Sequence, residues 1–295
     1  MSNADYVTRA IGQPFCPKAR LASAVDPLDT VLAITGLQST GPGDRWVGMA
    51  AMLGTEIVEV TQINDGNVHV KRGCADTVPS AHPTNTALWF FDSHVGTDGR
   101  EYVGGTVALK VLPKTSSQPT PITYSPPQNI TFSNRFIRPY PPANVLANGT
   151  SVFIATPRIT VSVPLSLTVA TRNRVVQADV LLGHTESSIS PEVGQLTRVR
   201  VYRLSNEMVA TYTFSGTSWS YDRSTAATDL SLVGDTGDSG AYLLLDSTRD
   251  GYPSWQSYRL DFTIDTTGLA SLPARLTEDG TPRLTEDGVT RTLEN

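Results

Sequence analysis

Prolines crowd the middle of this sequence, between two blocks in which polar and apolar residues alternate. They are Pro113, Pro119, Pro121, Pro126, Pro127, Pro139, Pro141 and Pro142. Proline fixes φ and has no N–H to donate to a sheet ladder, so a run this dense disfavours a central strand. We therefore expect residues 113–143 to form an extended linker that joins two separately folded β domains.

The first block, residues 1–112, has the pattern of a small antiparallel β domain. The strands predicted from period-two alternation are 56–62, 68–72, 88–91 and 106–112. The turn sequence Asn64-Asp65-Gly66-Asn67 separates the first two strands and predicts a hairpin. We expect this block to fold as a small barrel or a curled sheet.

The second block, residues 144–265, has the pattern of a β-sandwich of short strands. Its predicted strands are 159–163, 166–170, 198–204, 209–214, 241–245 and 256–264, with Asp250-Gly251 at the tip of a loop. About seven strands in a block of this length are typical of an immunoglobulin-like or fibronectin type III-like sandwich. The predicted fold class is therefore all-β.

Residues 266–295 are predicted to form an extended C-terminal tail with an eight-residue repeat. Leu276–Arg283 and Leu284–Arg291 both begin Leu-Thr-Glu-Asp-Gly. Each repeat buries too little apolar surface to fold alone, so we expect the tail to fold on another surface. Its candidate interaction residues are Leu276, Leu284, Val289 and Leu293. The alternative is a frayed, solvated chain end.

The charge of the chain disfavours some classes of partner. The net charge is −5, which leaves no overall basic surface for nucleic acid or for an anionic membrane. No run of 18 apolar residues and no signal-peptide pattern occurs, so we expect a soluble chain made in the cytosol, without membrane insertion.

Six short stretches resemble modules of the tail-tip and baseplate proteins of tailed bacteriophages. They are 73–82, 88–91, 111–115, 138–145, 183–191 and 254–257. The last three are similar to the join into, and the body of, a fibronectin type III-like domain in those proteins. The acidic repeat resembles the tails that end many of them. The resemblance spans most of residues 45–295 in order.

This resemblance implies a virion protein at the distal end of a phage tail, made in the host cytoplasm. Such a protein holds neighbouring tail proteins or fibres, is present in many copies with threefold or sixfold symmetry, and is not an enzyme. An upper baseplate protein, a fibre adaptor and a central tip protein all remain open. No cofactor and no metal ion are expected.

Two chemical signals compete with the structural interpretation. Gly237-Asp238-Ser239-Gly240 is similar to the nucleophile segment of chymotrypsin-like serine proteases, with His82 as the candidate base and Asp92 or Asp98 as the aspartate that would orient it. However, His82 lies in the other block, beyond the proline-rich segment, and hydrogen-bond geometry is hard to hold across such a linker. Two further sets lack a defined metal-binding spacing: Asp92, His94 and Asp98, and Asp229, Asp235 and Asp238. We favour solvated loops for both.

The alternative function is a receptor-binding or glycan-binding module at the tail tip. β-Sandwiches commonly carry ligand loops, and sugar sites present exposed aromatic rings beside polar groups. The candidate ligand loop surrounds Asp250-Gly251 and comprises Tyr252, Trp255 and Tyr258.

Overall fold

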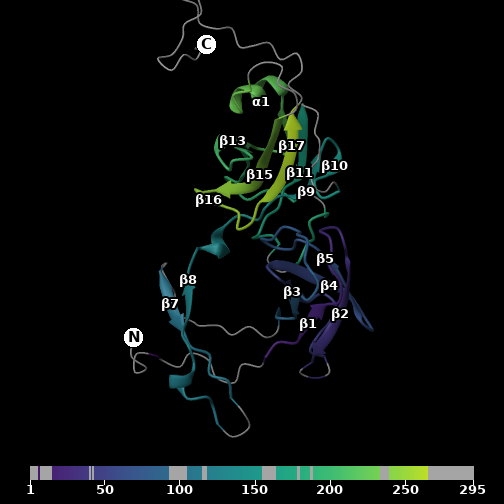
Figure 1. The fold of residues 1–295 in the computed structure, drawn as a ribbon, viewed down its shortest axis with the longest axis vertical. Helices are drawn as coiled ribbons and strands as arrows, with labels where there is room; N and C mark the ends of the chain where they lie inside the picture. Colours follow the sequence, from purple (N-terminus) through teal and green to yellow (C-terminus); the bar gives the residue numbers. More distant parts are fainter. Residues whose placement is uncertain are drawn as a thin grey trace, which may run out of the picture. The chain divides into compact units, whose positions relative to one another are not determined.

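The structure, a computed structural model, describes residues 6, 15–39, 41, 43–92, 105–114, 118–154, 164–177, 180–186, 189–232 and 239–264. The predicted all-β class is confirmed: the described residues form strands and loops with one short helix, α1 (Arg223–Asp229) (Figure 1). No helix among these residues is long and apolar enough to cross a membrane. The chain divides into two compact units: Met1–Pro139 with Gln177–Gly183, and Tyr140–Val176 with His184–Asn295.

Six strands of the first unit form a closed antiparallel barrel in the order β1-β2-β5-β4-β3-β6 (Figure 1). Their bounds are β1 (Lys18–Leu21), β2 (Val31–Gln38), β3 (Ala50–Leu53), β4 (Glu56–Asn64), β5 (Asn67–Lys71) and β6 (Ala87–Trp89). The predicted hairpin is confirmed, since Asn64 pairs with Asn67 and Gly66 adopts a φ of 76°. Closure leaves the barrel without a free sheet edge.

The period-two alternation of β4 and β5 fills the interior of the barrel. Val58 and Val60 of β4 are fully buried, as is Val68 of β5. Glu56 and Arg72 continue these two inward-facing series at neighbouring strand ends, and each is 1% exposed. The same alternation that builds an apolar core therefore also places two opposite charges inside the barrel.

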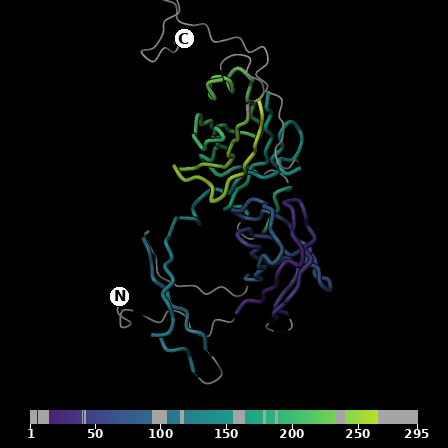
Figure 2. The backbone as a smooth tube through the Cα atoms, viewed as in Figure 1, coloured from purple at the N-terminus to yellow at the C-terminus, as the bar shows by residue number. Residues whose placement is uncertain are grey.

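Residues 106–112 are not part of the barrel, which corrects the sequence prediction. β7 (Thr106–Leu109) pairs with β8 (Gln128–Thr131) in a separate two-stranded sheet, and the two run side by side in Figure 2. Alternation predicts a strand but does not identify its partner, and here the partner lies between the prolines. Segment 113–143 thus contributes a strand, and it also contains two 3₁₀ turns, Ile122–Tyr124 and Arg135–Ile137.

The second unit contains two sheets with the strand order of a fibronectin type III-like sandwich. One sheet has the order β10-β9-β11-β14, and the other has β13-β12-β15, with both β16 and β17 pairing along the far side of β15. The bounds are β9 (Ala143–Ala147), β10 (Thr150–Ser151), β11 (Leu165–Ala170), β12 (Leu196–Arg203), β13 (Met208–Phe214), β14 (Ser218–Tyr221), β15 (Ser239–Arg249), β16 (Tyr252–Pro253) and β17 (Tyr258–Ile264). The predicted sandwich is confirmed.

Strands β11, β12, β13, β15 and β17 correspond to predicted strands, whereas β9, β14 and α1 were not predicted. The predicted strand 159–163 lies outside the described residues. The core of the sandwich includes Leu167 of β11, Val199 of β12 and Phe262 of β17, each at most 1% exposed. Asp250 and Gly251 form the two-residue turn between β15 and β16, both with positive φ, as Asp-Gly turns favour.

Candidate functional site

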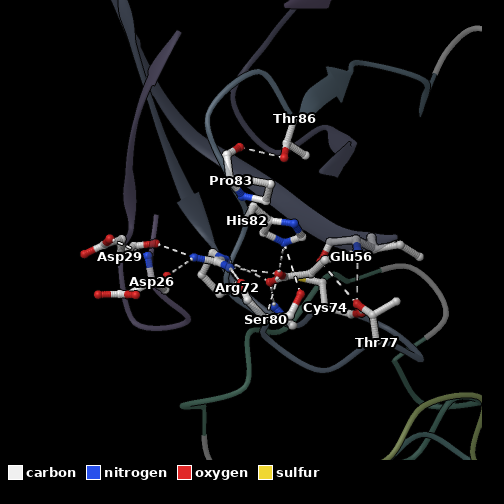
Figure 3. Close-up of polar contacts among 12 residues, drawn as sticks. Asp26, Asp29, Glu56, Arg72, Cys74, Thr77, Ser80, His82, Pro83 and Thr86 are labelled. Carbon is white, nitrogen blue, oxygen red and sulfur yellow. Dashed lines mark hydrogen bonds and ion pairs between the residues drawn. The ribbon is translucent and has the colours of Figure 1, made fainter. Parts of the chain in front are cut away.

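A buried guanidinium organises one end of the barrel (Figure 3). Nε and Nη2 of Arg72 each donate to a different carboxylate oxygen of Glu56, both at 2.8 Å. Nη1 donates to the carbonyl oxygens of Asp26 and Asp29, at 2.7 and 2.9 Å. Nη2 donates again to the carbonyl oxygen of Ser80, at 2.6 Å. All five N–H groups that an arginine carries therefore have an acceptor.

The carboxylate of Glu56 accepts further hydrogen bonds from Gly73, Ser80 and His82. Its Oε1 accepts the backbone N–H of Gly73 at 2.8 Å, and its Oε2 accepts that of Ser80 at 3.2 Å. Nε2 of His82 lies 2.9 Å from Oε2, and a carboxylate can only accept, so this nitrogen carries the hydrogen. We call Glu56, Arg72, Ser80 and His82 the barrel network.

The electrostatics of the barrel network favour an ionised Glu56. Burial alone would raise the pKa of Glu56, but the hydrogen bonds from His82 and Arg72 outweigh it and hold this pKa below its ordinary value. The network joins the β1–β2 loop, the start of β4, the end of β5 and the β5–β6 loop. The barrel network therefore stabilises this end of the barrel by connecting two loops to two strand ends.

The barrel network also bears on the protease hypothesis. Nε2 of His82 donates its hydrogen to Glu56, so this nitrogen has no free lone pair with which to accept a proton as a general base, and Oγ of Ser80 lies 3.2 Å from it. Ser239 opens β15 in the other unit, and Gly237 and Asp238 lie outside the described residues.

A second charged cluster lies on the outer face of the larger sandwich sheet. Asp246 of β15 is 1% exposed and accepts two hydrogen bonds from Arg198, at 2.9 and 2.8 Å. Nη2 of Arg200 donates to the same carboxylate at 2.7 Å. The bond to Asp246 also raises the pKa of Arg198 above its ordinary value. One buried carboxylate therefore fixes two neighbouring guanidinium groups on β12.

Aromatic rings continue this face along the same strands. Tyr202 of β12 and Tyr242 of β15 stack with ring centroids 5.0 Å apart and planes 2° from parallel. The guanidinium of Arg259, on β17, lies 3.9 Å above the Tyr242 ring. The arginine–tyrosine face comprises Arg198, Arg200, Tyr202, Tyr242, Asp246 and Arg259. Its side chains are held in place before any partner binds, which lowers the entropic cost of binding.

The predicted ligand loop is only partly presented to solvent. Trp255 is 41% exposed, and Tyr252 is half-buried in β16. Tyr258 is 2% exposed, and its ring packs 5.7 Å from that of Phe153, so Tyr258 is a core residue of the sandwich. A ligand at this loop could contact Tyr252 and Trp255, but not the ring face of Tyr258.

Two other sets of predicted positions remain: the tail residues and the acidic residues that were considered as metal ligands. The candidate interaction residues Leu276, Leu284, Val289 and Leu293 lie outside the described residues. Among the residues that the structure does describe, no three His, Cys, Asp or Glu side chains gather as metal ligands would. Asp92 instead accepts the backbone N–H of Ala50 at 3.2 Å, and Asp229 accepts the hydroxyl groups of Tyr212 and Tyr221.

The sequence prediction missed both charged clusters. One signal was available in the first unit: a charged residue stood two positions from a buried valine and so had to share its inward face. Glu56 stands in this relation to Val58, and Arg72 to Val70. On β12 the signal was the reverse, since Arg198 and Arg200 alternate with the buried Val199. Alternation along a strand therefore predicts the face on which a charged side chain lies. It does not predict which residue of another strand will pair with that side chain.

No protein-family model and no curated protein matches the chain. Among solved structures, it resembles the FN1–FN3 domains of chicken CNTN1, at 8% sequence identity. That match covers 92% of this chain and 72% of the other, with a TM-score of 0.24. At this TM-score the likeness supports no inference by itself, and the fibronectin type III-like description relies on the strand order given above.

We predict that Glu56→Gln destabilises the barrel by about 3–5 kcal/mol, because it leaves the Arg72 charge buried without its counter-charge. Denaturant titration of the full chain measures the change. Glu59→Gln is the matched control, since Glu59 lies on the same strand and pairs with the more exposed Lys71 at 3.0 Å. That change should cost only about 0–1 kcal/mol. Equal effects of the two substitutions would contradict the role assigned to the barrel network.

The lowered pKa of Glu56 also predicts an acid-sensitive barrel. The unfolded chain takes up this proton near its ordinary pKa of about 4.3, at a higher pH than the folded chain does. The stabilisation by Glu56 is therefore complete above that pH and is lost as pH falls through the folded pKa. In titrations from about pH 7 to pH 3, the stability difference between wild type and Glu56→Gln should narrow below about pH 4. A difference that stays constant would show that Glu56 does not titrate as described.

Proposed function

We propose that this chain is a structural protein of a bacteriophage tail tip or baseplate, where several copies hold neighbouring tail proteins or fibres. In this role it catalyses no reaction and needs no cofactor. Two features support the proposal. The six stretches that resemble such proteins span both units of the chain, and the second unit has the fibronectin type III-like strand order that the resemblance implies.

The observation that carries the proposal is the arginine–tyrosine face. Tyrosine and arginine are enriched at the centres of protein interfaces, where fixed side chains bind with little loss of conformational freedom. Here a 1% exposed Asp246 fixes two arginines, and a tyrosine stack lies beside them. Arg259 pairs with Asp261 at 2.9 Å and still keeps 51% of its side chain exposed above Tyr242, so a partner can reach part of this side chain. A rigid sheet that presents such a face suits a part that binds its neighbours.

The proposal predicts that an antibody against the chain labels the distal end of tails. The measurement is electron microscopy of immunogold-labelled particles from a lysate of the strain that encodes the chain. Arg259→Glu should lower the infectious titre, because it reverses a charge on the arginine–tyrosine face and weakens the contact that this face makes. Arg20→Glu, at an exposed arginine of the barrel, is the matched control and should leave the titre unchanged. Particles that carry no label would overturn the proposal.

The exposure of Trp255 supports an alternative, a receptor-binding or glycan-binding module at the same tail tip. Trp255 is 41% exposed and has a tyrosine nearby in β16, and an indole ring offers a flat apolar surface on which a sugar ring could stack.

For this alternative, we predict that the purified chain binds surface polysaccharide of the host, and that Trp255→Ala weakens binding about tenfold or more. Isothermal titration calorimetry with the isolated polysaccharide measures the affinity. Trp46→Ala is a matched control, because Trp46 is 38% exposed in the first unit. An absence of binding by the wild-type chain would exclude the alternative.

A further inference from the structure

The β7–β8 ribbon has one apolar face and one polar face. Val107 of β7 lies opposite Ile130 of β8, so Val107, Leu109, Ile130 and Phe132 share a face by alternation. The other face carries Thr106 and Thr131, whose hydroxyl oxygens lie 2.9 Å apart. Such alternation is typical of a sheet that packs one face against another layer.

The apolar face of this ribbon is nevertheless open. Leu109 is 41% exposed, Ile130 is 45% exposed and Phe132 is 36% exposed. Val111 extends the series by two residues and is 56% exposed. A two-stranded ribbon is marginally stable in water unless a further layer or strand covers it. We call Val107, Leu109, Val111, Ile130 and Phe132 the ribbon face.

The ribbon also leaves room for a further strand. Within the part of the chain that the structure describes, neither β7 nor β8 pairs with a third strand, and a sheet edge is where an extended segment can add by main-chain hydrogen bonds. A segment added at an edge would place alternate side chains over the ribbon face.

The charge around the ribbon specifies the chemistry of its partner. Residues 105–138 contain no Asp or Glu, although the whole chain has a net charge of −5. Their basic residues are Lys110, Lys114, Arg135 and Arg138. Arg135 is bound to Asp76, and Nζ of Lys110 donates to the carbonyl oxygen of Ile122 at 3.0 Å and lies 5.0 Å from the centre of the Tyr6 ring. An extended segment with apolar and acidic side chains would complement this surface in both polarity and charge.

One segment of the chain itself has this composition. Residues 276–295 combine the apolar Leu276, Leu284, Val289 and Leu293 with five acidic and two basic residues. The described residues end at Ile264 of β17, and an extended chain gains about 3.3 Å per residue, so the tail could span a distance on the order of 100 Å. That reach is enough to leave its own sandwich and meet another copy.

We propose that the C-terminal repeat, residues 276–295, of one copy binds the ribbon of a second copy. In an extended tail Leu276 and Leu284 have the same parity and cover the ribbon face, and Asp279 and Asp287 have the opposite parity and lie by Lys110 on the polar face. Each copy then offers one ribbon and one tail, so the contact is head-to-tail and can close into a ring. This inference rests on the proposed function, because it names the surface by which copies associate.

The test uses the purified full chain and its molar mass by light scattering across a concentration series. The ribbon variant carries Lys110→Glu and Lys114→Glu, and the tail variant carries Glu278→Lys, Asp279→Lys, Glu286→Lys and Asp287→Lys. The wild type should self-associate, and each variant alone should dissociate at least about tenfold more readily. The chain that combines both sets should recover association, since the charges are exchanged. Arg283→Glu with Arg291→Glu, the matched tail control, should associate at least as tightly as the wild type.

A second measurement addresses folding and location. Hydrogen exchange of the wild type should show protection of 106–109 and 128–131 that increases with concentration, and Ile130→Ser should reduce that protection while the barrel strands keep theirs. A wild type that is monomeric at every concentration would overturn the inference, as would association that the tail variant leaves intact. Binding of the wild type to vesicles of phosphatidylcholine and phosphatidylserine that Lys110→Glu with Lys114→Glu abolishes, with no self-association, would assign the ribbon to a lipid surface and also overturn the inference.

The two proposals can fail separately. Tail-tip labelling together with a monomeric purified chain would reject only this inference. Self-association through the ribbon and tail by a chain absent from phage particles would reject only the proposed function.

Discussion

The first unit depends on the ion pair between Glu56 and Arg72. Inside the barrel these two charged groups make with each other the polar contacts that each would otherwise make with water. A buried guanidinium is costly unless its donors find acceptors, and besides Glu56 the donors of Arg72 reach three carbonyl oxygens on two chain segments. Those segments include two long loops that carry little regular structure. The requirement to satisfy one side chain thus fixes the loops that cover this end of the barrel.

The sandwich uses a related arrangement at its surface. Asp246 is buried, but the two arginines that cover it remain about a fifth exposed. The carboxylate therefore acts inward as an anchor, while the guanidinium groups keep some contact with solvent. The two clusters differ in how deeply their arginines are buried. The enclosed pair of Glu56 and Arg72 joins segments of the barrel. The arginines on Asp246 are partly exposed, so they form a surface that other molecules can reach.

The strands of the first unit have two different environments. In the barrel every strand has two neighbours, so its backbone groups are satisfied and its edges are closed. In the ribbon each strand has one described neighbour and an apolar face that remains about two-fifths exposed at Leu109 and Ile130. The barrel can therefore be stable without a partner, whereas the exposed apolar side chains of the ribbon favour contact with a further layer or strand.

The sequence by itself determined the all-β class, the Asn64–Asn67 hairpin, five strands of the sandwich and the Asp250-Gly251 turn. These features follow from period-two alternation and from turn residues, which act over a few neighbouring positions. Only the tertiary structure decided that residues 106–109 leave the barrel, that Tyr258 is buried, and that Glu56 and Asp246 bind their particular arginines. Each of these outcomes depends on a partner that lies far along the chain, and local alternation carries no information about which distant strand will provide it.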